Sequence, residues 1–146
     1  MLARAAADPG ARWCWKSLRA NFPDMKVGTK EYQIFCEASG KEDAGDIRGA
    51  MRLYRILAKA GDAIAQSNLA NLLDDKVRPA KPREAVYWYK RAVRNGNYFA
   101  ALNLAMHYRN IGKSRWQIHW LRVAAKMGAP DARREIRKLE RDLGRR

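Results

Sequence analysis

Hydrophobic and polar positions alternate with a helical period along most of the chain. Three glycines, Gly61, Gly96 and Gly128, lie about one repeat apart, and the residues before them share a pattern. At 3, 4, 7, 8 and 11 positions before each glycine, nearly every residue is small, aliphatic or aromatic. This spacing puts those residues on one face of a helix, so it predicts a buried helical stripe that ends at a glycine.

The residues after each glycine predict a second kind of helix. Apolar residues stand at 4 and 8 positions after the glycines: Ala65, Leu69, Ala100, Leu104, Ala132 and Ile136. Residues that suit a helix N-terminus stand near each glycine, namely Asp62, Asn97 and Asp131. A helix pair of this size cannot bury its own stripe, so we expect neighbouring pairs to stack into an array.

The most regular copy is EAVYWYKRAVRNGNYFAALNLAMHY, residues 84–108. It resembles the Sel-one-like repeat family, a relative of the tetratricopeptide repeats, at eight positions: Ala85, Trp88, Tyr89, Ala92, Gly96, Ala100, Leu104 and Tyr108. The resemblance covers about residues 46–140, with one less complete copy before the regular copy and one after it. The family's glycine after leucine is replaced by Ala70 and Ala105. The resemblance implies an all-α, right-handed α/α solenoid of about three to four helix-pair repeats.

The front of the chain fits the repeat poorly. We expect residues 1–45 to form a degenerate N-terminal helical cap and residues 46–146 to form the solenoid as one continuous domain. The segment ARWCWKSLRANF predicts a helix, and KEYQIFCEAS predicts another with Tyr32, Phe35 and Cys36 buried. The second of these lies where the first helix of a degenerate repeat is expected. The last helix has a polar outer face that suits a terminal cap.

Charge is spread unevenly. The net charge is +15, and residues 76–146 carry +14 of it. Such a field attracts acidic partners, although a solvated basic face is the alternative interpretation. No apolar run is long enough for a membrane span, and the first residues lack a secretory signal, so we expect a cytoplasmic protein. Cys14 and Cys36 are then expected to stay reduced, and a disulfide between them requires an oxidising compartment.

Catalytic and metal-binding patterns are not found. His107 and His119 have no cysteine or carboxylate at ligand spacing, and no glycine-rich phosphate loop occurs. Paired-carboxylate chemistry is excluded over residues 76–112, where Glu84 is the single acid. We therefore expect no enzyme activity, no metal and no cofactor, with both histidines in packing or partner contacts.

The resemblance also implies a binding surface, because the first helix of each pair lines the inner face of such a solenoid. We expect a partner to contact these residues of the first helices and the last helix: Asn68, Asn71, Asn103, Met106, His107, Asn110, Arg134, Arg137 and Lys138. Asn68 and Asn103 share one repeat offset, where asparagine suits hydrogen bonds to an extended peptide backbone, as in related tetratricopeptide domains. Asparagine as a simple family choice at that offset is an equal alternative. Arginine side chains suit carboxylates.

These observations favour a non-catalytic protein-interaction module, an adaptor or an inhibitor, that binds an acidic protein. One form of this hypothesis is a bacterial immunity protein that neutralises a cognate toxin, and another is an adaptor for a secretion-system component. Nucleic-acid binding is the less favoured alternative, since it rests on charge alone and no groove-reading motif occurs. The sequence does not give the oligomeric state.

Overall fold

The computed structural model describes residues 28–145, and every regular element in this part is a helix. In chain order the elements are α2 (Lys30–Asp43), α3 (Ile47–Lys59), α4 (Ala63–Asn71), the π-helical turn η2 (Leu72–Lys76), α5 (Pro82–Arg94), α6 (Tyr98–Asn110), α7 (Ser114–Lys126) and α8 (Ala132–Gly144). The predicted all-α fold is therefore confirmed for this part of the chain. The helix predicted for residues 11–22 lies outside the described residues.

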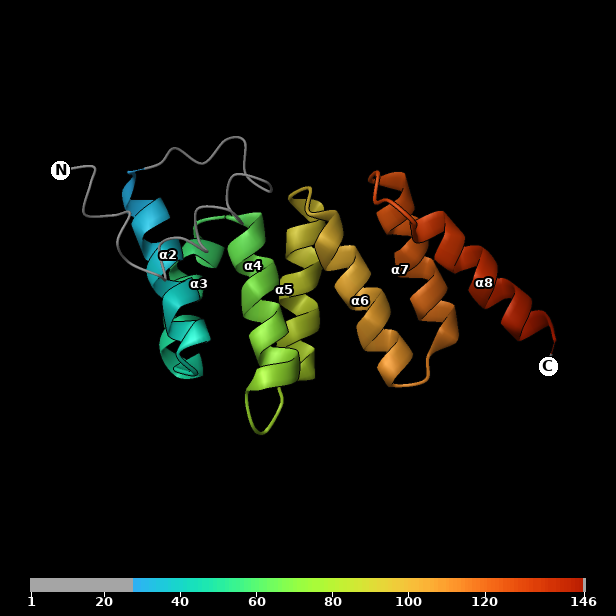
Figure 1. Cartoon of the computed structure of the whole chain (residues 1–146), viewed down its shortest axis with the longest axis horizontal. Helices are drawn as coiled ribbons and strands as arrows, with labels where there is room; N and C mark the ends of the chain where they lie inside the picture. The colour runs from blue at the N-terminus through green and yellow to red at the C-terminus, as the bar shows by residue number, and fades with distance from the viewer. Residues whose placement is uncertain (1–27, 146) are drawn as a thin grey trace.

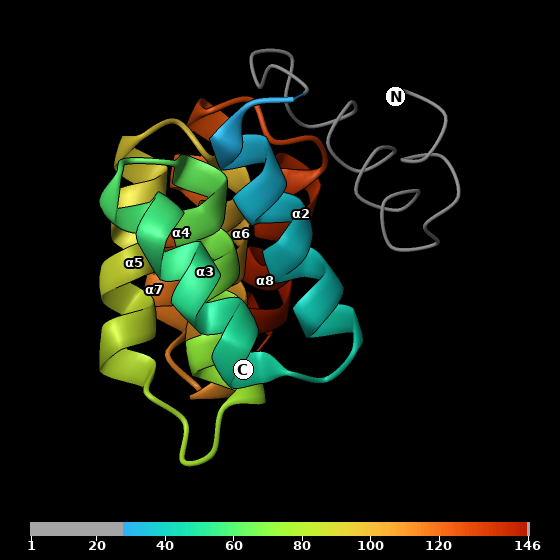
Figure 2. The same ribbon diagram turned by 90° about the vertical axis from the view of Figure 1, so that its left-hand side faces the viewer.

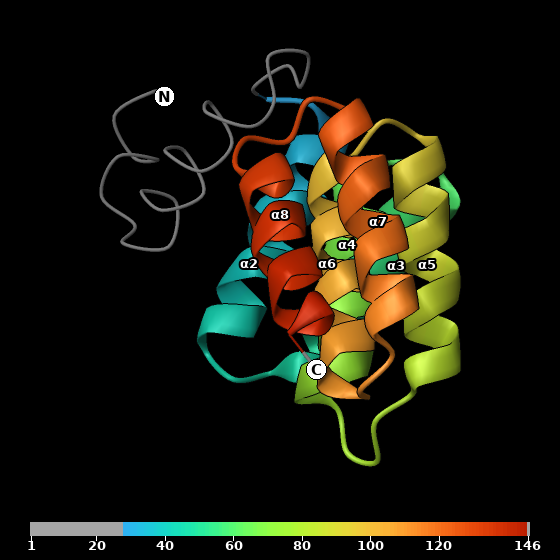
Figure 3. The ribbon, with the colours of Figure 1, turned by 90° about the vertical axis from the view of Figure 1, so that its right-hand side faces the viewer.

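Consecutive helices lie side by side in a row from α2 to α8 (Figure 1). Each helix packs mainly against the helix before it and the helix after it, as in a helical solenoid. The end-on views show two layers, with α2, α4, α6 and α8 on one side and α3, α5 and α7 on the other (Figures 2 and 3). The first helices of the pairs therefore share one face of the array.

The buried residues follow the predicted stripe. The positions 4 and 7 before each glycine are buried in all three copies: Leu57, Ala92, Ala124, Tyr54, Tyr89 and Leu121. Ala65, Ala100 and Ala132, at 4 positions after the glycines, are also buried, with at most 1% of their surface exposed. These alanines let neighbouring helices approach closely. The two indoles at the eighth position before the glycine, Trp88 and Trp120, are also buried, as the sequence predicts.

The three repeat glycines end their helices in the same way. Gly61, Gly96 and Gly128 have φ values of +100°, +90° and +92°, a region that glycine enters without steric cost. After Gly96, the backbone N–H of Asn97 donates to the carbonyl of Ala92 at 3.0 Å, and the other two copies repeat this bond. The left-handed conformation of the glycine allows this bond to form. The bond satisfies a carbonyl that the end of a helix otherwise leaves unpaired.

The starts of the following helices are less uniform. The Asp62 carboxylate accepts from the N–H groups of Ile64 and Ala65, and the Asn97 side chain accepts from the N–H of Ala100. Asp131 precedes α8 with φ +63° and makes no such side-chain bond; its carboxylate lies 3.4 Å from Arg134 instead. The prediction of N-terminal polar residues is thus confirmed at two copies, whereas the third lacks the capping hydrogen bond.

The helix α2 pairs with α3, where the sequence places the first helix of a degenerate repeat. Phe35 is buried against Tyr54 with ring centroids 5.6 Å apart, whereas Tyr32 and Cys36 are half-buried. Cys36 is disulfide-bonded, so the expected reduced thiol is wrong for this residue; Cys14 lies outside the described residues. Among the helices described here, none has the length and apolar character needed to cross a lipid bilayer.

Candidate binding site

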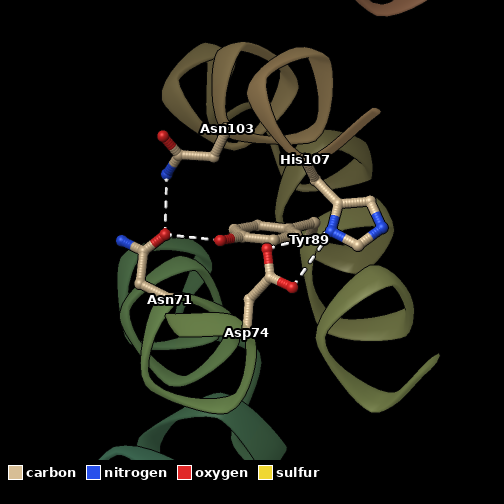
Figure 4. A network of polar contacts seen from close by, with 5 residues as sticks. All are labelled: Asn71, Asp74, Tyr89, Asn103 and His107. Atoms are coloured by element: carbon tan, nitrogen blue, oxygen red, sulfur yellow. Dashed lines mark hydrogen bonds and ion pairs between the residues drawn. The ribbon is translucent and has the colours of Figure 1, made fainter. Parts of the chain in front are cut away.

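Five side chains from α4, η2, α5 and α6 form a polar network (Figure 4). The Asn71 carbonyl oxygen Oδ1 accepts two hydrogen bonds, one from the Tyr89 hydroxyl at 2.6 Å and one from the Asn103 amide at 3.0 Å. Beside them, the His107 Nδ1 atom lies 3.0 Å from both oxygens of Asp74. The network joins the first helices of two neighbouring pairs, α4 and α6.

Tyr89 fixes the orientation of the Asn71 amide. Burial raises the pKa of the Tyr89 hydroxyl well above its usual value, and the nearby charges of Asp74 and Asp75 raise it further. The hydroxyl therefore stays protonated and donates to Asn71. With Oδ1 engaged twice, the Asn71 amide nitrogen points away from Tyr89, and so does the Asn103 carbonyl oxygen (Figure 4). Neither of these two atoms has a hydrogen-bond partner within residues 28–145.

His107 and Asp74 form the most buried ion-pairing contact of the described residues. The His107 side chain is 9% exposed and the Asp74 side chain 21% exposed. Both oxygens of Asp74 face the same imidazole nitrogen, so Nδ1 is the natural position for the ring proton. The Tyr108 ring meets His107 in a T-shaped contact with centroids 5.2 Å apart. These contacts hold the imidazole in one orientation.

The π-helical turn η2 positions Asp74. In this turn the Val77 N–H donates to the Leu72 carbonyl, five residues back, at 2.9 Å. Leu72 and Leu73 are fully buried, which anchors the turn and brings Asp74 against α6. Single π-helical turns inside or at the end of α-helices occur frequently at functional sites.

The structure brings together three of the nine residues that the sequence predicts for the site, Asn71, Asn103 and His107. Asn71 and Asn103 are bonded to each other, and His107 is buried against Asp74. Asn68 is half-buried on α4, while Met106 and Asn110 are exposed on α6. Met106 is 51% exposed, as are several other large apolar side chains of the described residues.

The three basic site residues lie apart from the network, on α8 at the end of the array. Arg134, Arg137 and Lys138 are all exposed. Arg134 lies 3.4 Å from Asp131, and Arg137 and Lys138 form no ion pair within the described part of the chain. The nine residues therefore form two groups, one at α4 and α6 and one on α8.

Two members of the network, Asp74 and Tyr89, are absent from the predicted site. Asp74 is 33 residues before His107, and Asn71 is 32 residues before Asn103. Both separations are close to the repeat length, because equivalent helices of neighbouring pairs lie next to each other. The sequence signal for Asp74 is its position, because it is a polar residue about one repeat length before His107.

No cluster of three or more metal-ligating side chains occurs among residues 28–145. His119, the second histidine, is exposed on α7 and meets the rings of Trp116 and Trp120 rather than a carboxylate. The described site thus offers a carboxylate–imidazole pair with a buried imidazole, and two amide groups with unused hydrogen-bonding atoms. This arrangement suits binding of a polar chain.

Comparison with known proteins gives one partial match. The F-box protein At1g70590 of Arabidopsis thaliana is 36% identical over 64 residues, which is 44% of this chain. The matched segment spans 18% of the length of that F-box protein. No family model and no solved structure matches the chain.

Proposed function

We propose that this chain is a non-catalytic protein-interaction module, built from Sel-one-like repeats, that binds an acidic protein. The partner's polypeptide lies on the face formed by α4 and α6, and the basic C-terminal half attracts it. As an adaptor or an inhibitor, the protein acts through this contact rather than through chemistry. The right-handed solenoid of three to four repeats belongs to the same proposal, whereas most of the expected N-terminal cap, residues 1–27, lies outside the described residues.

The observation that carries the proposal is the orientation of the two asparagines. The Asn71 amide N–H group and the Asn103 carbonyl oxygen are left without partners on one side of their hydrogen bond. One donor and one acceptor side by side match the C=O and N–H groups of an extended peptide backbone. Tyr89 orients Asn71 before binding, so less conformational freedom is lost when the partner docks.

The charge distribution supports an acidic partner. Of the net charge of +15, +14 belongs to residues 76–146, which include α5 to α8. A one-sided field of this kind speeds the approach of a protein of opposite charge, and the short-range contacts at α4 and α6 then set how long it stays.

More specific versions of this proposal differ in the partner. A bacterial immunity protein binds a toxin, and an adaptor binds a component of a secretion system. The partner's identity separates these two. Nucleic-acid binding is the second class of function, because the same charge attracts phosphates. The expected cytoplasmic location is not carried into this proposal, because the disulfide at Cys36 favours an oxidising compartment, since cytosolic thiols are normally kept reduced.

The test is affinity capture with the full chain, with and without nuclease, followed by binding measurements on the recovered partner. We expect an acidic protein that survives nuclease treatment. The Asn71→Leu/Asn103→Leu double variant removes the paired amides and is expected to release that partner at least about tenfold faster, which corresponds to about 1.4 kcal/mol. Gln117→Ala, which removes an amide from α7 in the other layer, serves as the matched control.

Two results contradict the proposal. Recovery of nucleic acid alone, with a steep loss of binding at high salt, supports the second class of function instead. An acidic partner that binds the double variant as tightly as the wild type excludes the face formed by α4 and α6.

A further inference from the structure

A row of three aromatic side chains lies where α6 and α7 meet. The rings of Tyr108 and Trp116 stack with centroids 5.8 Å apart and planes 26° apart. The His119 ring meets the edge of this stack, 5.6 Å from Trp116 at an angle of 80°. Trp116 is 50% exposed and His119 is exposed. We name Tyr108, Trp116 and His119 the aromatic platform.

Repeat packing does not require Trp116. It stands 12 positions before Gly128, outside the stripe of buried positions, and the other two copies have Gly49 and Glu84 at this offset. By contrast, Trp88 and Trp120 belong to the stripe and are only 6% and 9% exposed. A large ring that is half exposed yet held by two neighbours is typical of a contact residue at a protein interface.

The charged residues next to the platform in the chain are all positive. Arg109, Lys113 and Arg115 flank the rings in sequence, and all three are exposed. None of them forms an ion pair within the described residues, whereas Arg122, on the same helix as Trp116, bonds Glu140 at 2.9 Å. The surrounding segment, residues 85–130, contains no Asp or Glu. The chain segment that carries the platform therefore supplies no acid of its own to neutralise these basic side chains.

The turn between the helices adds an apolar side chain. Ile111 lies between Tyr108 and Trp116 in the chain and is 51% exposed. Tyr108 covers one face of the Trp116 ring, so the row offers one open indole with an aliphatic residue nearby in sequence. A single-stranded nucleic acid needs a series of open ring faces on which successive bases stack. One open ring with a neighbouring isoleucine suits a single apolar side chain better.

We infer that the aromatic platform, with Arg109, Lys113 and Arg115, binds an acidic peptide segment of a partner protein that carries one bulky apolar side chain. The apolar side chain packs on Trp116, and carboxylates on either side of it pair with the guanidinium and ammonium groups. Arginine binds carboxylates through two parallel hydrogen bonds, which fixes the segment's position. This inference deepens the proposed function and rests on it for the acidity of the partner, but it uses a different surface.

The test measures binding of fluorescein-labelled twelve-residue peptides to the full chain by fluorescence anisotropy. The first peptide consists of Asp and Glu around one central Phe, the second has Gly in place of the Phe, and the third has Lys in place of the acids. We expect the first peptide to bind at least about tenfold more tightly than the second, and the third not to bind. Trp116→Ala is expected to weaken the first peptide at least about tenfold, and Trp116→Phe to retain most of the affinity.

Phe99→Ala serves as the control, because Phe99 is a 48% exposed aromatic residue on α6 outside the platform. It is expected to leave peptide binding unchanged. Circular dichroism of each variant confirms that the helices are retained. A twelve-nucleotide thymidine oligomer, labelled in the same way, provides the nucleic-acid arm of the experiment.

Three outcomes overturn the inference. If none of the peptides binds, or if the Phe and Gly peptides bind equally, no apolar side chain docks on Trp116. If the oligomer binds more tightly than the acidic peptide and is lost in Trp116→Ala, the platform is a nucleic-acid site. If the acidic peptide binds and is weakened by Asn71→Leu/Asn103→Leu but not by Trp116→Ala, the proposed function stands while the platform is excluded.

Discussion

The Nδ1 atom of His107 lies 3.0 Å from both carboxylate oxygens of Asp74, a residue 33 positions earlier in the chain. The contact joins the π-helical turn after α4 to α6, so it crosses from one helix pair to the next. His107 is buried and Asp74 is mostly covered. The pair therefore ties the two repeats together beside the asparagines of the proposed binding face (Figure 4).

We predict that Asp74→Ala lowers the free energy of unfolding by about 1–3 kcal/mol, because it leaves a buried imidazole N–H without its acceptor. The measurement is urea denaturation followed by helical signal. The neighbouring Asp75→Ala is the control, since Asp75 is exposed and its Lys76 contact at 3.8 Å is a surface pair; its effect is expected within about 0.5 kcal/mol.

A double-mutant cycle tests whether the two residues act together. Asp74→Ala and His107→Ala in one chain are expected to cost less than the sum of the single changes, by about 0.5–3 kcal/mol. Strict additivity contradicts a direct energetic coupling between them.

Repeat periodicity makes part of this architecture predictable. Burial of Tyr54, Tyr89 and Leu121 follows from their common offset, because the same helix face packs in each copy. The Asp74 contact does not follow from helical periodicity alone, since the π-helical turn shifts the register after Asn71. Position within the repeat also does not show how exposed a residue outside the stripe is, which is why Trp116 is not among the predicted site residues.

We predict that Trp88→Ala costs about 3–5 kcal/mol of stability, because Trp88 is 6% exposed and its truncation leaves a cavity between helix pairs. Trp116→Ala is the matched control, because it removes the same side chain from a half-exposed position. We expect it to cost about 1 kcal/mol or less, as is usual for surface changes. Equal losses in the two variants contradict the assigned repeat register.

Two glycines are expected to respond to alanine in opposite directions. A Cβ atom added at either Gly96 or Gly40 meets nothing within 4 Å, so the backbone alone decides the outcome. Gly96 has φ +90°, and alanine there is expected to cost about 1–2 kcal/mol. Gly40 lies inside α2, where alanine is expected to add about 0.5–1 kcal/mol. Thermal melting of both variants checks this, and a stabilising Gly96→Ala contradicts it.

Glu42 is expected to make stability depend on pH. Burial raises the pKa of its carboxyl above 4.5, although the hydrogen bond from Tyr54, 3.2 Å long, lowers it in part. Between the ordinary pKa of 4.5 and the raised pKa of the folded protein, the folded state binds more protons than the unfolded state. The contribution of Glu42 to the free energy of unfolding therefore falls as pH rises through that range. Glu42→Gln keeps an acceptor for Tyr54 and removes the half-buried charge.

The expected result is that Glu42→Gln melts at least as high as the wild type at pH 7, with a difference that shrinks as pH falls to about 4.5. Glu37→Gln, which removes an exposed charge from the same helix, controls for the change in net charge. A Glu42→Gln protein that is less stable than the wild type at every pH shows that the charged carboxylate is favourable at this position.

The last prediction separates steering by the basic half from contact at α4 and α6. Reversing Arg134 and Arg137 to Glu is expected to slow association with an acidic partner and to reduce its salt dependence, because salt screens long-range attraction.

Arg48→Glu/Arg52→Glu changes the net charge equally but on exposed positions of α3, at the other end of the array. If charge location matters, the α3 variant retains faster association than the α8 variant in stopped-flow measurements at two salt concentrations. Replacement of Asn103 by Ala is expected to speed dissociation instead, because a short-range hydrogen bond contributes mainly after encounter. Equal slowing by the two charge reversals contradicts docking at the C-terminal end, since net charge alone then accounts for the attraction.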